Sequence, residues 1–276
     1  MSEHTGASKP FYPSGHHASV LASHRQRTAE NSAPLLLPLL RPTDSLLDIG
    51  CGPGSITITF APYVTRVIGV EHPSAGEDVL KSAEEDARVS GVADKVSFQQ
   101  ADALALPFED KSFDVVYCHQ VLQHVPDPVK VLQEMRRVSK RLVAAREADR
   151  GSFVLHPHDE EGRLKKFDEL WTKVARAGGG EPDAARRLKS WALSAGFSPS
   201  DVEVQTGSTC PDVKEWGEML AERTVKTGFA DKVVELGLAS KDELEQIAEA
   251  WRDWTRKEDA WFGYLQGDLI AWKERD

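Results

Sequence analysis

The stretch that decides the fold is Ser45-Leu46-Leu47-Asp48-Ile49-Gly50-Cys51-Gly52-Pro53-Gly54-Ser55. Its first five residues predict a short buried strand, because a parallel strand covered on both faces reads as a nearly continuous apolar run. Three glycines at alternate positions follow, and they allow the backbone to turn sharply and to approach a ligand closely. We expect a helix to begin after Gly54, so that its free N–H groups and positive dipole end face the same ligand.

The pattern around this stretch predicts an α/β fold with a doubly wound, mostly parallel sheet. Short apolar or alternating runs predict four further strands, at residues 64–70, 96–99, 113–118 and 141–146. Amphipathic runs predict helices before and between them, at residues 20–40, 74–90 and 128–138. Strands that alternate with helices at this spacing form a parallel sheet with helices on both faces.

The pattern changes after residue 150. Further helices are expected at residues 159–177 and 184–195, and a further strand at residues 201–209. Asp212 and Ser240 each stand three residues before a glutamate, which is the spacing of a helix-capping box. We therefore expect a helical cap at residues 210–262, inserted before a last strand at residues 267–273.

Three acidic residues near the expected strand ends indicate the class of ligand. Asp48 lies two residues before Gly50, where a carboxylate can meet the ammonium group of S-adenosylmethionine (SAM), directly or through water. Glu71 ends the second strand, where doubly wound folds place an acid that accepts hydrogen bonds from ribose hydroxyls. Asp102 follows the third strand and can accept the exocyclic amine of adenine. The glycine spacing is G-x-G-x-G rather than the G-x-G-x-x-G of dinucleotide sites, so it favours SAM over a nicotinamide cofactor.

An ordered set of motifs carries a family resemblance. Its members are Asp48 to Gly54, Glu71, Ala101-Asp102-Ala103, Leu106-Pro107-Phe108 to Val116, and Val121-Leu122-Gln123-His124. Together they resemble the ubiquinone/menaquinone-biosynthesis-like branch of the class I SAM-dependent methyltransferases, over roughly residues 30–146. The resemblance implies a Rossmann-like sheet of seven strands in the order 3-2-1-4-5-7-6, with strand seven antiparallel, and SAM as the cofactor.

The same resemblance implies an organisation of the chain. Residues 1–33 would form an N-terminal segment and helix that covers the cofactor site. Residues 34–150 would form the SAM-binding core. Residues 151–276 lie beyond the resemblance: their own pattern predicts the end of the sheet together with an added helical cap at residues 210–262, which we expect to bind the substrate.

The resemblance also implies roles for single residues. His72 follows the second-strand acid and packs on adenine, while His119 and Gln120 follow strand four and lie near the transferred methyl group. His24 and Arg27 belong to the N-terminal helix that folds over the cofactor in relatives, and Arg27 can hold the SAM carboxylate with its forked guanidinium. The cofactor-binding candidates are Arg27, Asp48, Gly50, Cys51, Gly52, Pro53, Gly54, Glu71, His72, Asp102, Ala103 and His119.

Methyl transfer is an in-line displacement, so alignment and exclusion of water can supply most of the catalysis and a base is optional. His124 is the first candidate base, because it follows strand four and should face the mouth of the pocket. In the alternative interpretation His124 is structural: it would contact the residues that line the site rather than the ligand, or it would cap a helix. Gln120 and His24 complete the set of catalytic candidates.

Composition limits the partners. The net charge of -10 repels a phosphate backbone, so we predict no nucleic-acid partner, and the apolar run at residues 35–40 is too short to span a membrane. Three widely spaced cysteines indicate reduced thiols in an intracellular protein, which we expect to be cytoplasmic, with a nuclear location as the open alternative. We predict no metal ion, because the histidines match no zinc spacing and strand four lacks the acid that seats Mg²⁺ in catechol-type enzymes.

The sequence predicts an acceptor that is a small, partly apolar molecule, methylated at O, N, S or C by a monomer or homodimer. All seven tryptophans lie at or after Trp171, so we expect large aromatics to build the cap and one or two to line the acceptor pocket. Three other functions stay open: a SAM-fold enzyme that catalyses cyclisation or elimination, a non-catalytic SAM-binding partner, and a nicotinamide oxidoreductase.

Overall fold

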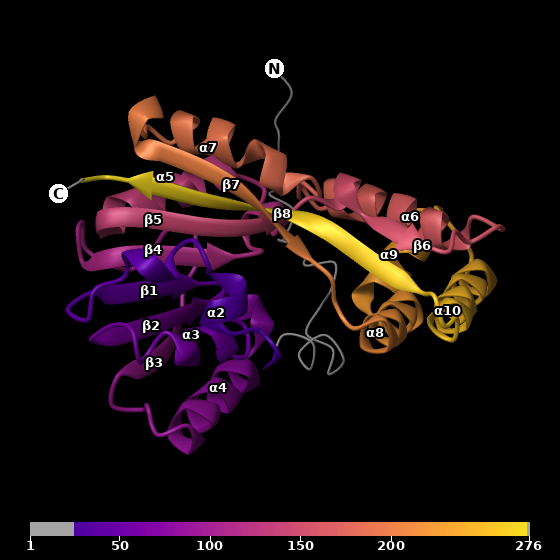
Figure 1. Cartoon of the computed structure of the whole chain (residues 1–276), viewed down its shortest axis with the longest axis horizontal. Helices are drawn as coiled ribbons and strands as arrows, with labels where there is room; N and C mark the ends of the chain where they lie inside the picture. Colours follow the sequence, from indigo (N-terminus) through magenta and orange to yellow (C-terminus); the bar gives the residue numbers. More distant parts are fainter. Residues whose placement is uncertain (1–24, 275–276) are drawn as a thin grey trace.

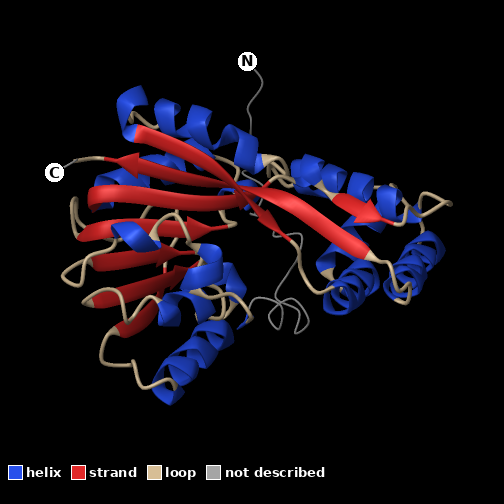
Figure 2. Cartoon of the chain, viewed as in Figure 1, coloured by secondary structure: helices blue, strands red, loops and turns tan. Residues whose placement is uncertain are grey.

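The computed structural model describes residues 25–274, which form an α/β core at one end and a helical cap at the other (Figure 1). One mixed sheet runs through both parts (Figure 2). Its strands are β1 (Ser45–Ile49), β2 (Arg66–Glu71), β3 (Val96–Gln100), β4 (Phe113–His119), β5 (Ser139–Ala148), β6 (Val154–His156), β7 (Val202–Thr209) and β8 (Trp261–Trp272). The helices are α2 (Ala29–Ser32), α3 (Ser55–Thr59), α4 (Glu77–Val89), α5 (Pro128–Val138), α6 (Arg163–Ala177), α7 (Leu188–Ser194), α8 (Val213–Lys226), α9 (Gly228–Glu235) and α10 (Lys241–Thr255).

The order of the strands confirms the predicted topology. The path is β3-β2-β1-β4-β5-β8-β6, with β7 pairing β8. Strands β1 to β5 pair in parallel, and β8 runs antiparallel to both β5 and β7. The sheet has one strand more than predicted, since β6 adds a short antiparallel pair to the first residues of β8. The carboxyl ends of β1 to β5 therefore lie together along one edge, where ligands of such sheets bind.

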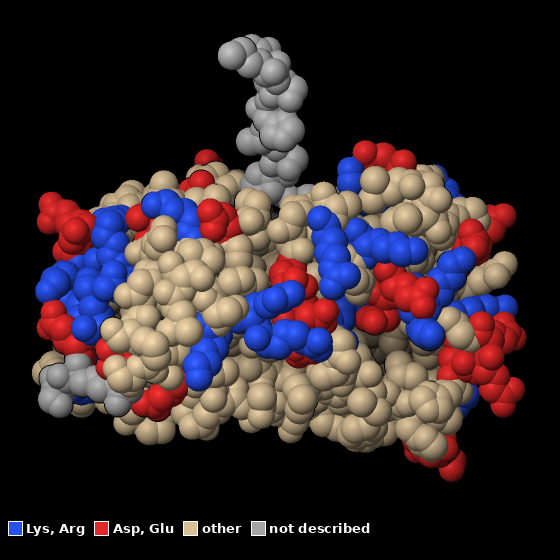
Figure 3. Space-filling model, turned by 90° about the horizontal axis from the view of Figure 1, so that it is seen from above, with Lys and Arg blue, Asp and Glu red and all other residues tan. Residues whose placement is uncertain are grey.

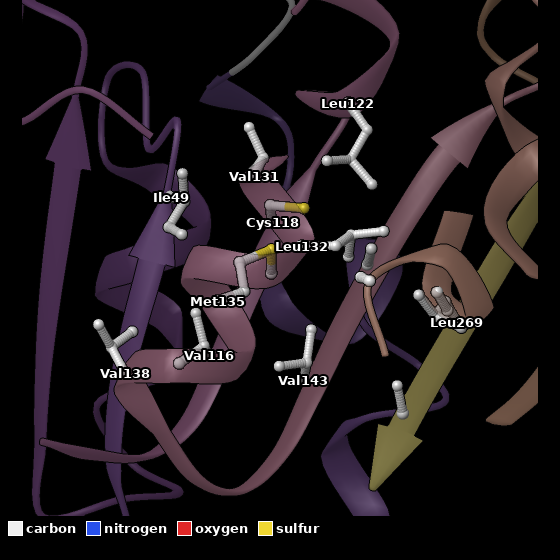
Figure 4. Packing of buried hydrophobic residues seen from close by; sticks show 14 of the residues in the cluster. Ile49, Val116, Cys118, Leu122, Val131, Leu132, Met135, Val138, Val143 and Leu269 are labelled. Atoms are coloured by element: carbon white, nitrogen blue, oxygen red, sulfur yellow. The ribbon is translucent and has the colours of Figure 1, made fainter. Parts of the chain in front are cut away.

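Helices cover both faces of the core sheet. Helices α5 and α7 lie on one face, and α3 and α4 lie on the other (Figure 1). Figure 4 shows the first of these faces, where Leu132 and Met135 of α5 pack against Val116 of β4 and Val143 of β5. Helix α5 has the predicted bounds because the Asp127 side chain accepts the Lys130 N–H at 2.9 Å and caps its first turn.

One hydrophobic cluster fills each face of the core sheet, and a third, the cap cluster, builds the helical cap. It joins α8, α9 and α10, which are inserted between β7 and β8, to α6 and to the first half of β8. Trp171, Trp251 and Trp254 are buried in it, as the distribution of tryptophans predicted. Strand β8 begins at Trp261, six residues before the predicted strand, because its first half pairs and packs within the cap.

Two other local predictions are corrected. Within the described residues, the helix expected at residues 20–40 is replaced by the four-residue α2, which begins at a Thr28–Asn31 capping box and stops before Pro34, and by a 3-10 helix at Leu37–Leu39. Helix α9 was not expected; the Thr227 hydroxyl accepts the Phe229 N–H at 3.3 Å and begins it. The caps expected at Asp212 and Ser240 are confirmed at the starts of α8 and α10.

Candidate active site

The glycine loop joins β1 to α3 at the carboxyl edge of the sheet. Gly50, Gly52 and Gly54 have φ values of 69°, 52° and 80°, in the left-handed region that favours glycine. The N–H groups of Gly50 and Cys51 donate to the Val70 carbonyl at 2.8 and 3.1 Å, so β2 holds the loop. Pro53 lies between Gly52 and Gly54, and α3 begins at Ser55 with Gly54 as its N-cap.

Glu71 fixes the loop from the end of β2. One carboxylate oxygen accepts the Gly52 N–H at 2.8 Å, and the other accepts the His72 N–H at 2.7 Å. A carboxylate offers about four lone-pair positions, so two remain for a ligand. Next to it, the partly exposed His72 places its Nδ1 at 2.7 Å from the Ser74 hydroxyl. The structure thus brings the predicted acid, the predicted adenine-packing residue and the glycine loop together.

Asp48 lies below the loop rather than on its surface. Its side chain is buried and accepts the Thr57 hydroxyl at 2.6 Å. Burial raises the pKa of Asp48 to about 7, although the Thr57 bond favours the charged form. Cys51 is buried beside it, and burial raises the pKa of the Cys51 thiol as well. The Asp48 side chain joins β1 to α3, and any contact with a ligand runs through the loop or through water.

Asp102 and Ala103 follow β3. The Asp102 carboxylate is exposed and accepts the Leu104 N–H at 2.9 Å, which shapes the turn after the strand. The preceding Ala101 donates its N–H to the Glu71 carbonyl at 2.9 Å, so this turn lies beside the end of β2. Ala103 packs against the core cluster on the α5 face. The three predicted acids therefore lie at the carboxyl ends of three neighbouring strands: Asp48 within β1, Glu71 at the end of β2, and Asp102 after β3.

A second group of residues lies where β4 ends. Gln120 has a φ of 54°, which is uncommon for a residue with a side chain and marks a constrained turn. Arg27 donates to the Gln120 side-chain carbonyl at 3.1 Å and lies 3.4 Å from His119 Nδ1. His119 is buried, and burial together with the charges of Arg27 and Arg146 holds its pKa well below the usual range. Three predicted site residues thus form one contact group.

A buried glutamate of β5 holds the turn that carries His124. The Glu147 carboxyl group accepts the N–H groups of Val121, Leu122 and Gln123 at 2.9, 2.8 and 3.3 Å. Burial raises the pKa of Glu147 to about 8. His124 ends this turn, and burial followed by the charges of Arg223 and Arg27 lowers its pKa to about 3. Its imidazole is therefore neutral at physiological pH, and the same burial and charges make it a weak base.

A cavity of about 400 Å³ opens from these residues toward the cap. Its core end is lined by Arg27, His119, Gln120 and His124, and its cap end by aromatic rings that include Trp171 and Trp216. Tyr264 and Gln266 of β8 form the wall between the two ends. The volume is that of a small-molecule site.

Comparisons with known proteins agree with this arrangement. Residues 47–142 match the family model described as a methyltransferase domain. An uncharacterized methyltransferase of Schizosaccharomyces pombe is 32% identical and is covered over 97% of its length by 96% of this chain. The chain belongs to the class I SAM-dependent methyltransferases.

Solved structures support the fold of this methyltransferase. The YcgJ protein of Bacillus subtilis has a TM-score of 0.57 at 22% identity, covering 90% of this chain and 99% of that chain. Phosphoethanolamine N-methyltransferase 2 of Haemonchus contortus, solved with SAM bound, has a TM-score of 0.51 at 18% identity, covering 90% of this chain and 52% of that chain. SAM is the cofactor of this methyltransferase, because the chain belongs to the SAM-dependent family.

Three contacts of the methyltransferase were not predicted from the sequence. Residues 25–27 cross from the core to the cap: Arg25 donates to Ser82 of α4 at 2.8 Å, and Gln26 donates to Glu215 of α8 at 2.6 Å. The second is the hydrogen bonding of Glu147 to the turn after β4, and the third is the position of Arg223 in the cavity wall. His24, the remaining catalytic candidate, lies outside the described residues.

The described part of the chain gives further limits. It contains no cluster of three or more His, Cys, Asp or Glu side chains that could hold a metal ion. None of its helices is long and apolar enough to cross a membrane. On the face in Figure 3, Lys and Arg side chains are interspersed with Asp and Glu.

Proposed function

We propose that this methyltransferase transfers the methyl group of SAM to an O, N, S or C atom of a small, partly apolar acceptor, without a metal ion. The observation that carries the proposal is the cavity of about 400 Å³ that connects the turn after β4 with the aromatic cap. One end adjoins residues that the family places near the transferred methyl group, and the other end is apolar enough to hold the body of an acceptor.

The residues of the core fit SAM. Glu71 keeps two lone-pair positions beside the glycine loop, which suits a pair of ribose hydroxyls. His72 and Asp102 lie next to it at the ends of β2 and β3, where the adenine would lie. When bound, the cofactor supplies an electrophilic methyl group on a sulfonium. The core residues bind and orient it. Of the segment predicted to cover it, residues 1–24 lie outside the described residues.

The residues at the core end of the cavity would align the acceptor. Gln120 is held by Arg27 and by Gln266, whose side-chain oxygen lies 3.4 Å from Gln120 Nε2, so its position is fixed before any ligand binds. His124 is neutral but a weak base, with a pKa of about 3, so it can take a proton from an O–H or N–H acceptor only after binding has raised this pKa. The cap would exclude water from the reacting atoms.

The test is to incubate the full-length protein and methyl-deuterated SAM with extracts of small molecules and to search for labelled products by mass spectrometry. We expect at least one product that carries the labelled methyl group and that is lost with the Glu71→Ala variant. Binding of SAM with no labelled product from any extract would contradict the proposal.

A further inference from the structure

The charge of the cavity wall is opposite to that of the protein. Three arginines line it, and the described lining residues include no aspartate or glutamate. The two histidines of the wall, His119 and His124, have lowered pKa values and add no charge near pH 7. The whole chain has 44 acidic and 34 basic residues. A cavity lined by one sign of charge concentrates ligands of the other sign.

The three arginines lie at different places in the cavity wall. Arg150 forms an ion pair with Asp168 at 2.5 Å, and its guanidinium lies over the rings of Phe153 and Trp171 at 4.8 and 4.9 Å. It therefore belongs to the packing of the cap. Arg27 contacts His119 and Gln120 at the core end, beside the proposed cofactor site.

Arg223 has a different position. It lies on α8 in the cap, is partly exposed, and places its guanidinium carbon 5.2 Å from the centroid of the Trp171 ring. A guanidinium whose face stacks on an aromatic ring still presents its N–H groups in its own plane, and that edge matches a carboxylate.

The surrounding wall is rich in aromatic rings. Trp216 and Tyr264 lie at the same cavity with ring centroids 5.6 Å apart and an angle of 38° between their planes. Together with Trp171 they supply apolar surface next to Arg223. Aromatic rings of this kind stack on planar ligands.

We infer that the acceptor is a flat, largely apolar molecule that bears a carboxylate, and that Arg223 binds this carboxylate at the cap end of the cavity. This inference rests on the proposed function, because it assigns the substrate class of the same site. Arg223 is then the residue that selects anionic over neutral acceptors.

The environment of His124 supports the inference. The charges of Arg223 and Arg27 are two of the three causes that lower its pKa to about 3, the first being burial. A carboxylate bound at Arg223 offsets one of these charges. Binding of the correct acceptor therefore makes His124 more basic, whereas a neutral molecule of the same shape does not.

The experiment uses matched pairs of probes that differ only in charge: benzoate and benzamide, 2-naphthoate and 2-naphthamide, indole-3-acetate and indole-3-acetamide. Each is titrated by calorimetry into the full-length protein saturated with S-adenosylhomocysteine. We expect at least one acid to bind about tenfold or more tightly than its amide, the smallest effect of a charged hydrogen bond. The Arg223→Gln variant should reduce this preference to about twofold or less.

The control is Lys226→Gln, which removes a positive charge from the same helix where Lys226 pairs with Glu222 at 2.8 Å. It should keep the preference, and both variants should bind S-adenosylhomocysteine as the wild type does. Equal binding of every acid and its amide by the wild type would overturn the inference, and so would a preference that survives Arg223→Gln. If Arg223→Gln fails to fold, the test is the binding of each acid and its amide to the wild type and to Arg223→Lys.

Failure of the proposed function gives a different result. In that case the acid preference is present and depends on Arg223, but the labelled methyl group reaches no product.

Discussion

Gly50→Ala is the substitution that best tests the geometry of the glycine loop. Gly50 has a φ of 69°, and a Cβ built there would lie 2.4 Å from Cγ2 of Val121. Val121 cannot retreat easily, because its N–H donates to the buried Glu147 at 2.9 Å. Its branched side chain also has few alternative rotamers. The loop and the turn after β4 would therefore be forced apart.

The size of the effect follows from two contributions. An L-residue in the left-handed region costs about 1–2 kcal/mol, and overpacking in a close contact costs about 1–3 kcal/mol more. We expect Gly50→Ala to lower the free energy of unfolding by about 2–5 kcal/mol. Gly91→Ala is the matched control, because Gly91 has a φ of 72° but no heavy atom within 4 Å of the position that an added Cβ would take. Its cost should be the backbone contribution alone, about 1–2 kcal/mol.

Urea unfolding of both variants measures the difference. The gain from a less flexible unfolded chain is the same for both and cancels in the comparison. Calorimetric titration with SAM, at a temperature where both variants are folded, should show weaker binding only for Gly50→Ala. Equal unfolding free energies for the two variants would refute the close approach of Val121 to the loop.

Three further predictions follow from the site. Glu71→Ala should weaken SAM binding in calorimetry by about 2–3 kcal/mol, roughly 30- to 150-fold, and unchanged affinity would remove Glu71 from the site. Glu147→Gln should flatten the fall in stability between about pH 4.5 and pH 8, measured by urea unfolding across that range. Because the pKa of Glu147 in the folded protein is about 8, the group stabilises the fold at low pH, and the free energy of unfolding falls by a few kcal/mol as the pH rises. Asp48 leaves a residual slope up to about pH 7. His124→Asn should lower kcat for an O–H or N–H acceptor by about 10²- to 10⁴-fold with SAM affinity unchanged, whereas the exposed His156→Asn should act like the wild type.

The parts of the fold that could be predicted are those specified by local pattern. The run at residues 45–55 gives a buried strand, a turn with positive φ and a helix start, because each depends only on neighbouring residues. The caps at Asp212 and Ser240 are equally local. The strand order came from the family resemblance rather than from any pattern in single segments.

The unpredicted parts depend on distant contacts. The first half of β8 is a strand because β6 pairs with it and the cap packs on it, and a short aromatic run near Trp261 does not reveal that partner. Gln26 and Glu215 are 189 positions apart. Glu147 did carry a signal, since a charged residue at the end of an apolar strand must find partners when buried, and the N–H groups after β4 are those partners.

Strand β8 determines how the site can be altered. Leu269 lies in the core cluster and Phe262 in the cap cluster, while Tyr264 and Gln266 between them line the cavity. The spacing between the carboxyl edge of the core and the aromatic cap is therefore set within one continuous strand that is anchored at both ends. Removing α8 to α10 would expose Phe262 and the rest of the cap cluster, so loss of activity would not separate stability from substrate binding. Acceptor choice is better tested by single substitutions such as Arg223→Gln, which change the cavity wall and leave both hydrophobic clusters in place.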